Sequence, residues 1–144
     1  GFNNRPGYIV NKEGLILGKH EGVAFYTIGQ RGGLGIALGY PLYVTELSSR
    51  NNRIVVGKRE EAYKSEFLVK NAHFILQPIK KKIALKVRIR YNHKEMPAQI
   101  QRLANNRVRV YFQRPQFAIT PGQSAVFYDK DTVVGGGIID EVLS

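Results

Sequence analysis

Short runs of β-branched and aromatic residues, each bounded by glycine, asparagine, aspartate or serine, recur along this chain of 144 residues. Apolar residues spaced three and four apart, the mark of an amphipathic helix, are scarce. In the stretch 83–90 the apolar residues take every second position, which is the period of a strand with one buried face. The pattern therefore predicts an all-β protein of short antiparallel strands joined by tight turns.

Two hairpins are predicted in residues 1–61, which we take as one small β domain. Turn residues at 11–14 and 48–52 separate apolar runs of strand length. The strands are expected at 8–10, 15–17, 42–47 and 53–57. Between the hairpins the stretch 21–36 is rich in glycine and irregular, with one helical turn expected over 25–30.

A stretch of mixed charge without a strand pattern, 58–66, follows, and we place the domain boundary between residues 61 and 62. Residues 62–144 predict a six-stranded antiparallel β-barrel, because closing the sheet removes the edges that six short strands would leave exposed. These strands are expected at 67–69, 83–91, 98–103, 107–112, 124–128 and 132–139. Gly135-Gly136-Gly137 lies inside the last of them and indicates a bulge or close backbone packing.

The chain carries 22 Lys and Arg against 11 Asp and Glu, a formal net charge of +11 that attracts polyanions. The surplus is concentrated in residues 62–144, which carry 14 basic and 6 acidic side chains. Within them, 80–114 holds 11 basic side chains and a single acid, Glu95. This distribution favours nucleic acid as the partner, although a charge run is also typical of a solvated face.

Two of the predicted barrel strands each carry a basic face, because charged and apolar residues alternate along them. The outward residues are Lys86, Arg88 and Arg90 in the first, and Arg107, Arg109 and Tyr111 in the second. Cationic rows with an interleaved tyrosine suit phosphates and exposed bases. The candidates for a basic binding surface are therefore Lys86, Arg88, Arg107 and Arg109.

A glycine-rich segment, 18–36, is the most unusual local stretch of the first region. Its glycines permit positive φ angles and close approach of the backbone to a ligand. His20, Gln30 and Arg31 lie within it and have the chemistry to meet a phosphate or a base. The alternative is a glycine-rich connection in which the polar side chains satisfy backbone groups.

Several classes of site are excluded by residues that the chain lacks. It has no cysteine, which rules out disulfides, thiolate zinc sites and cysteine nucleophiles. Its three histidines lie far apart without the spacing of metal ligands, so no metal site is expected. No Gly-Lys-Ser or Gly-Lys-Thr loop is present, and Gly33-Leu34-Gly35 lacks the third glycine of a dinucleotide fingerprint. From its residues alone the chain is a binding module with no means of holding ATP.

No membrane or secretory segment is visible in the sequence. No apolar run approaches the roughly 20 residues that a membrane helix needs. The first residues lack the apolar region of a signal peptide. We therefore expect a cytoplasmic protein without a membrane partner.

Six segments, spread in order over almost the whole chain, resemble the tRNA-specific 2-thiouridylase family. Among them are Tyr26-Thr27-Ile28-Gly29-Gln30-Arg31, Ile89-Arg90-Tyr91 and Thr120-Pro121-Gly122-Gln123. The complete set is 5–10, 18–36, 42–44, 89–91, 118–128 and 135–139. The resemblance implies three parts: an N-terminal ATP-pyrophosphatase domain, a small central β domain, and a C-terminal β-barrel resembling the second domain of elongation factor Tu. This chain is similar to the last two.

The resemblance also implies an activity for the full-length protein. Members of the family are sulfurtransferases that use ATP, with Mg, to thiolate the wobble uridine of tRNA at position 2 through a cysteine persulfide. Their partners are the anticodon arm of tRNA and a sulfur-donor protein. The ATP loop and both catalytic cysteines belong to the first domain, so this fragment should hold no cofactor and be inactive alone.

Carried over by motif, the tRNA contacts of the family fall on Arg90, Tyr91 and Gln123. His20, Gln30 and Arg31 would help to position the substrate. The sequence departs from the family at Gly32, where a lysine usually follows the arginine, so no phosphate contact is carried over there. The alternative is a stand-alone translation-factor-like β-barrel that binds ribosomal RNA or a protein partner.

Overall fold

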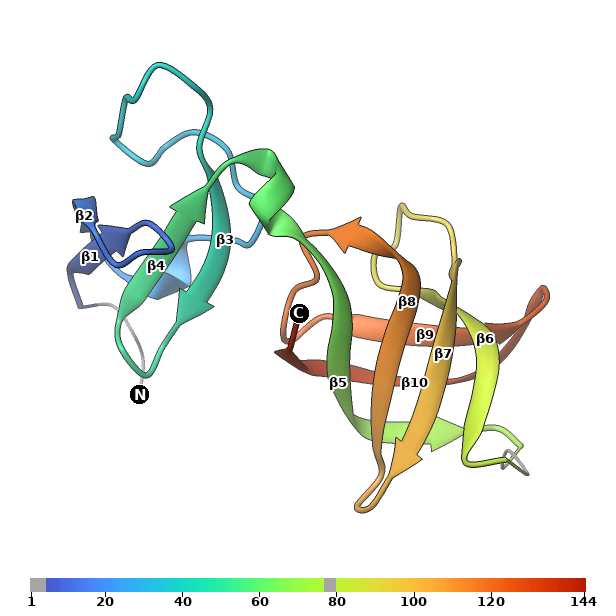
Figure 1. Cartoon of the computed structure of the whole chain (residues 1–144). Helices are drawn as coiled ribbons and strands as arrows, with labels where there is room; N and C mark the ends of the chain where they lie inside the picture. Colours follow the sequence, from blue (N-terminus) through green and yellow to red (C-terminus); the bar gives the residue numbers. More distant parts are fainter. Residues whose placement is uncertain (1–4, 77–79) are drawn as a thin grey trace. The chain divides into compact units, whose positions relative to one another are not determined.

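In a computed structural model, which describes residues 5–76 and 80–144, the chain consists of strands, turns and two short 3-10 helices. Its internal contacts divide it into two compact units, one ending at Tyr63 and the other beginning at Lys64. The second unit is a closed six-stranded antiparallel barrel and the first holds a smaller sheet (Figure 1), which confirms the all-β fold class. Within the described ranges no helix is long and apolar enough to cross a membrane.

The sheet of the first unit is built from two hairpins. Its strands are β1 (Gly7–Val10), β2 (Ile16–His20), β3 (Tyr43–Ser48) and β4 (Arg53–Gly57), in the order β2-β1-β4-β3. Both predicted hairpins form, and a parallel pairing of β1 with β4 joins them. Ile9, Val10 and Ile54 on this pair are at most 2% exposed, so burial of apolar surface holds the two hairpins together.

The helical turn predicted over 25–30 is wrong in its position. A 3-10 helix, η1 (Val23–Phe25), precedes most of this stretch. Beyond it, Gly29 donates its N–H to the carbonyl of Val44 on β3 at 2.7 Å, and Gln30 accepts from the N–H of Val44 at 2.9 Å. A helix over 25–30 would use the N–H of Gly29 for a bond within the helix, so the bond of this N–H to Val44 is incompatible with it.

The barrel contains all six strands that the sequence predicts for it. They are β5 (Tyr63–Phe74), β6 (Lys82–Arg88), β7 (Met96–Leu103), β8 (Arg107–Phe117), β9 (Ser124–Asp129) and β10 (Thr132–Val142). Their closed order is β10-β5-β8-β7-β6-β9. β7 therefore lies between β6 and β8, the two strands with predicted basic faces.

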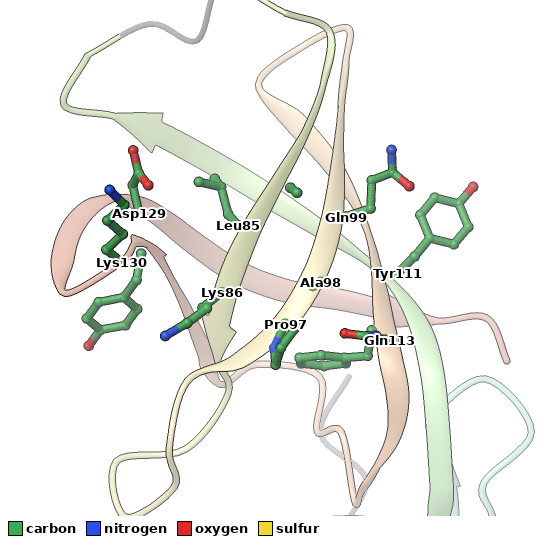
Figure 2. Close-up of a pocket in the computed structure, with 12 residues that line it drawn as sticks. Leu85, Lys86, Pro97, Ala98, Gln99, Tyr111, Gln113, Asp129 and Lys130 are labelled. Atoms are coloured by element: carbon green, nitrogen blue, oxygen red, sulfur yellow. The ribbon is translucent and has the colours of Figure 1, made fainter.

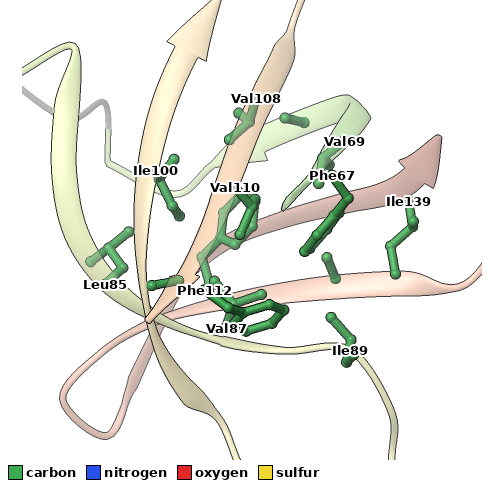
Figure 3. Packing of buried hydrophobic residues seen from close by; sticks show 14 of the residues in the cluster. Phe67, Val69, Leu85, Val87, Ile89, Ile100, Val108, Val110, Phe112 and Ile139 are labelled. Carbon is green, nitrogen blue, oxygen red and sulfur yellow. The ribbon is translucent and has the colours of Figure 1, made fainter. Parts of the chain in front are cut away.

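Inward-facing apolar side chains fill the barrel (Figure 3). Phe67, Ile100 and Val110 are fully buried, and the ring of Phe67 lies 5.6 Å from that of Phe112. The alternation predicted for β6 is confirmed, since Leu85 and Val87 are buried while their neighbours Lys86 and Arg88 are only half-buried. Because alternate residues of each strand must face this one apolar interior, the residues between them face outward.

The start of the barrel differs from the prediction. The stretch 58–66, expected to lack strand structure, holds the 3-10 helix η2 (Arg59–Ala62) and the first residues of β5. The N–H groups of Ser65 and Glu66 donate to the carbonyl of Ser144 at 2.6 and 2.8 Å. Because this partner lies at the other end of the chain, the local sequence does not indicate the strand.

The glycine run 135–137 lies in β10, where the register shifts in the pairing with β5 and in the pairing with β9. A Cβ atom at Gly137 would lie 2.5 Å from Cγ1 of Val69 and 2.7 Å from the carbonyl oxygen of Lys70. No side chain fits in that space. The predicted bulge and close packing are both confirmed.

Candidate nucleic-acid interface

Arg90 follows the end of β6 and its side chain connects two loops. Its guanidinium donates from Nη2 to the carbonyl oxygen of Ala118 at 2.6 Å and lies 5.7 Å from the ring centre of Phe117. Partial burial lowers the pKa of this guanidinium. The β6–β7 loop is thereby attached to the β8–β9 loop at one end of the barrel.

The β8–β9 loop is held by hydrogen bonds within the loop and to β10. Ala118 has a positive φ of 57°, and its carbonyl also accepts a hydrogen bond from the hydroxyl of Thr120 at 2.8 Å. The N–H of Gln123 donates to the carbonyl of Thr120, and the carbonyl of Gln123 accepts from the N–H of Ile139 at 2.8 Å. With its backbone fixed, Gln123 is an exposed residue at the same end of the barrel as Arg90.

Tyr91 lies at the tip of the β6–β7 loop. The loop turns there because the N–H of His93 donates to the carbonyl of Arg90 at 3.1 Å. β6 therefore ends at Arg88, whereas the sequence predicted a strand that continues to residue 91. Tyr91 is 89% exposed, and the neighbouring His93 and Lys94 are also exposed. An accessible aromatic ring with the cationic side chains of Arg90 and Lys94 in the same loop suits stacking on an unpaired base.

The predicted basic surface is divided in two. Lys86 and Arg88 lie on β6, and Arg107 and Arg109 lie on β8. Between them the outward residues of β7 include Gln99, paired with Ala84 of β6, and Gln101, paired with Arg109. A strip of uncharged amide side chains therefore separates the two basic faces.

Arg109 is the most strongly engaged of these four residues. Its guanidinium forms a hydrogen bond and an ion pair with Glu66 of β5, and this bond raises its pKa. It also lies 5.4 Å from the ring centre of Tyr111. The charge of Arg109 is therefore largely compensated within the barrel.

His20 and Gln30 in the first unit turn their side chains to the backbone. His20 is 1% exposed, and its Nε2 lies 2.9 Å from the carbonyl oxygen of Asn52. Gln30 accepts a hydrogen bond from the N–H of Thr27 at 3.0 Å and donates to the carbonyl of Gly32 at 3.2 Å. For both residues the geometry favours the alternative in which polar side chains satisfy backbone groups.

Arg31 is placed differently from these two residues. It is exposed, and its backbone makes an isolated bridge to Tyr43. Together with the stretch 32–37 it lines a surface hollow of about 420 Å³. Of the three residues predicted to position a substrate, Arg31 is the one that reaches the surface of its unit.

Two family models cover almost the whole chain. Residues 64–139 match the aminomethyltransferase beta-barrel domain, and residues 2–58 match the tRNA methyl transferase PRC-barrel domain. A tRNA-specific 2-thiouridylase MnmA of Acetivibrio thermocellus is 50% identical over 136 residues, which are 94% of this chain and 38% of the relative. A tRNA-specific 2-thiouridylase MnmA 2 of Clostridium botulinum is 48% identical over 140 residues, 96% of this chain and 40% of the relative.

The chain belongs to the tRNA-specific 2-thiouridylase family. The matched segments are the central and C-terminal domains of the family, which confirms the resemblance stated from the sequence. This thiouridylase chain spans about two fifths of the length of the curated relatives it matches, with 38% and 40% covered.

Two groups that shape the thiouridylase barrel end were not predicted from the sequence. They are the ring of Phe117 and the carbonyl of Ala118, which both contact Arg90. A positive φ at an alanine is a feature of the folded backbone, and no residue type signals it in advance. Among residues 5–76 and 80–144, no group of three His, Asp or Glu converges where a metal ion could bind.

Proposed function

We propose that this chain is the non-catalytic, tRNA-holding portion of a tRNA-specific 2-thiouridylase. The barrel end with Arg90, Tyr91 and Gln123 contacts the anticodon arm of tRNA. The observation that carries the proposal is the hydrogen bond from Arg90 to Ala118, because it holds the loops of Tyr91 and Gln123 at one end of the barrel. The relatives named above, which are tRNA-specific 2-thiouridylases, supply the substrate class.

Each of the three residues contributes a different kind of contact. Arg90 has five N–H donors, so it can meet a phosphate while one of them remains on Ala118. Tyr91 offers an exposed ring for base stacking, and the amide of Gln123 can both donate and accept hydrogen bonds. The surplus of basic over acidic residues in 62–144 draws the polyanion to this unit.

The full-length enzyme, in this proposal, thiolates the wobble uridine in the cytoplasm with ATP and Mg, by way of a cysteine persulfide filled by a sulfur-donor protein. The chain itself has no cysteine to carry the persulfide and no Gly-Lys-Ser or Gly-Lys-Thr loop to cradle ATP. Those groups belong to the domain that precedes these two in the family. We expect no turnover from this chain alone, and we assign Arg31 to the positioning of substrate beside that domain.

Binding of tRNA to the 144-residue chain tests the proposal. We expect an intact tRNA with a wobble uridine to bind, with an affinity that falls steeply as salt rises because phosphate contacts release counterions. A hairpin carrying only the anticodon arm should retain most of this affinity, and a hairpin carrying only the acceptor arm is the matched control. Absence of tRNA binding even at low salt, or equal affinity for both hairpins, contradicts the proposal.

A further inference from the structure

The outer wall of the barrel contains a hollow that the proposed tRNA contacts do not use. It lies over β9, β6, β7 and β8 and has a volume of about 540 Å³ (Figure 2). Figure 2 shows Lys130 and Tyr111 on opposite sides of it, with β6 and β7 between them. The hollow is away from Arg90, Tyr91 and Gln123, none of which lines it.

Strand pairing determines how the side chains of this wall are arranged. Lys86 of β6 lies opposite Tyr128 of β9 on one side and Pro97 of β7 on the other. In the adjacent row, Gln99 of β7 lies opposite Ala84 of β6 and Tyr111 of β8. The two tyrosines are therefore at opposite sides of the wall, and the small residues lie between them.

The hollow exists because Ala84 and Pro97 are short. On the outside of a barrel, neighbouring positions usually carry long polar side chains, as Lys86 and Gln99 do here. Between these long side chains, the short apolar side chains of Ala84 and Pro97 form the floor of the hollow. A flat ligand with an apolar face can settle on such a floor and still reach the polar groups around it.

The separation of the tyrosines limits what can bind. Tyr128 of β9 and Tyr111 of β8 lie three strands apart in the closed ring of six, which is roughly 14 Å measured along the curved wall at the usual spacing between strands. One base clasped between two rings needs only about twice the 3.4 Å repeat of a nucleic-acid strand. The tyrosines are too far apart for that, and suit two bases of one strand, each stacked on its own ring.

Both tyrosines are positioned by arginines. The guanidinium of Arg88 lies 5.5 Å from the ring centre of Tyr128, and that of Arg109 lies 5.4 Å from the ring centre of Tyr111. Such cation–π contacts restrict the rings before any ligand arrives. Tyr111 nevertheless remains 37% exposed, and Tyr128 is half-buried.

The charge and polarity of the hollow match a nucleic-acid strand. Lys86 and Lys130 line it and can neutralise phosphates, and Asp129 is the acid among the described residues around it. The amide of Gln99 can donate to and accept from the edges of bases. The surplus of 14 basic over 6 acidic residues in 62–144 favours an anionic ligand over a neutral peptide.

We propose that this hollow binds a short unpaired stretch of RNA. One base stacks on Tyr111 and another on Tyr128, while Lys86 and Lys130 contact the backbone phosphates. The inference rests on the proposed function for the class of ligand, RNA, and assigns the barrel a second contact area besides its loop end.

Binding of a fluorescent single-stranded RNA oligonucleotide to the 144-residue chain tests this site. The double variant Tyr111→Ala, Tyr128→Ala removes both rings, and Tyr111→Phe, Tyr128→Phe is the matched control that keeps them. We expect the double alanine variant to bind at least about fivefold more weakly, because stacking is lost, and the phenylalanine variant to bind like the unaltered chain. Thermal unfolding of each variant checks that the barrel is intact.

Several results would overturn the inference. These are unchanged binding by the alanine variant, equal loss by the phenylalanine variant, or an equal effect on an RNA duplex of the same sequence. Capture of a proline-rich peptide in place of the oligonucleotide would also overturn it. Arg90→Ala separates this inference from the proposed function. If Arg90→Ala leaves tRNA binding intact while the tyrosine variants lose oligonucleotide binding, the proposed function is wrong and the inference about the hollow is retained. If Arg90→Ala weakens tRNA binding while the tyrosine variants bind the oligonucleotide normally, only the inference about the hollow is wrong.

Discussion

The glycine-rich segment of the small sheet and the loops at the end of the barrel carry similar polar residues, but they use them differently. In the small sheet, the side chains of His20 and Gln30 form hydrogen bonds with carbonyl and N–H groups of the backbone. In the barrel, the backbone of the loop that holds Gln123 is satisfied by Thr120 and Ile139. The side chain of a loop residue is available to a ligand when other groups already satisfy the backbone around it.

Replacing His20 tests the structural half of this comparison and should have the largest effect. His20→Ala removes a buried ring and leaves the carbonyl of Asn52 without its partner, so we expect the first unit to lose about 2–3 kcal/mol of unfolding free energy. Denaturant unfolding measures the loss. The tRNA affinity of the folded protein should stay the same, and a large drop in affinity without a loss of stability would show that His20 contacts the substrate.

Replacing Arg90 tests the binding half. We expect Arg90→Ala to weaken tRNA binding by about 1–3 kcal/mol, because a charge-assisted contact and the attachment of two loops are both lost. Fluorescence titration at fixed salt measures it, with Lys12→Ala, an exposed lysine of the other unit, as the control for loss of one charge. Equal effects of the two substitutions would mean that Arg90 acts only through its charge.

Replacing Tyr91 should affect tRNA binding with the smallest accompanying change in stability. Its ring is 89% exposed, so Tyr91→Ala should change the unfolding free energy by less than about 0.5 kcal/mol. If a base stacks on the ring, the same substitution weakens tRNA binding by about 1–3 kcal/mol, and Tyr91→Phe restores it. Failure of phenylalanine to restore binding would point to the hydroxyl group instead of stacking.

Gln123 should give the smallest effect. Its exposed amide can add one neutral hydrogen bond to tRNA, so Gln123→Ala should cost about 1 kcal/mol of binding free energy. The matched substitution is Gln30→Ala, where the amide is bonded within its own turn. We expect Gln30→Ala to lower stability without changing affinity, and the opposite result for either glutamine would reverse the comparison.

Features with a local cause were predictable from the sequence. The alternation in β6 and β8 correctly placed Lys86 and Arg109 outside and Val87 and Val110 inside, because the period of a strand is set by its own backbone. The hairpins of the first unit were also correct, since turn residues mark them.

Features that depend on a distant partner were not predictable. The first residues of β5 pair with Ser144, the last residue of the chain, and the guanidinium of Arg90 bonds to a carbonyl 28 residues away. The pairing of Gln30 with β3 replaced the expected helical turn. In each case the hydrogen-bond partner that determines the local structure is too far away in the sequence to contribute to a local sequence pattern.

Hydrogen exchange of the chain with and without tRNA tests the central claim most directly, because it compares all loops in one experiment. We predict that tRNA protects amides in the loops 89–95 and 118–123, which hold Arg90, Tyr91 and Gln123. The turn 104–106 at the other end of the barrel and the turn 48–52 of the small sheet should be unaffected. Protection confined to the small sheet, or to the turn 104–106, would contradict the account.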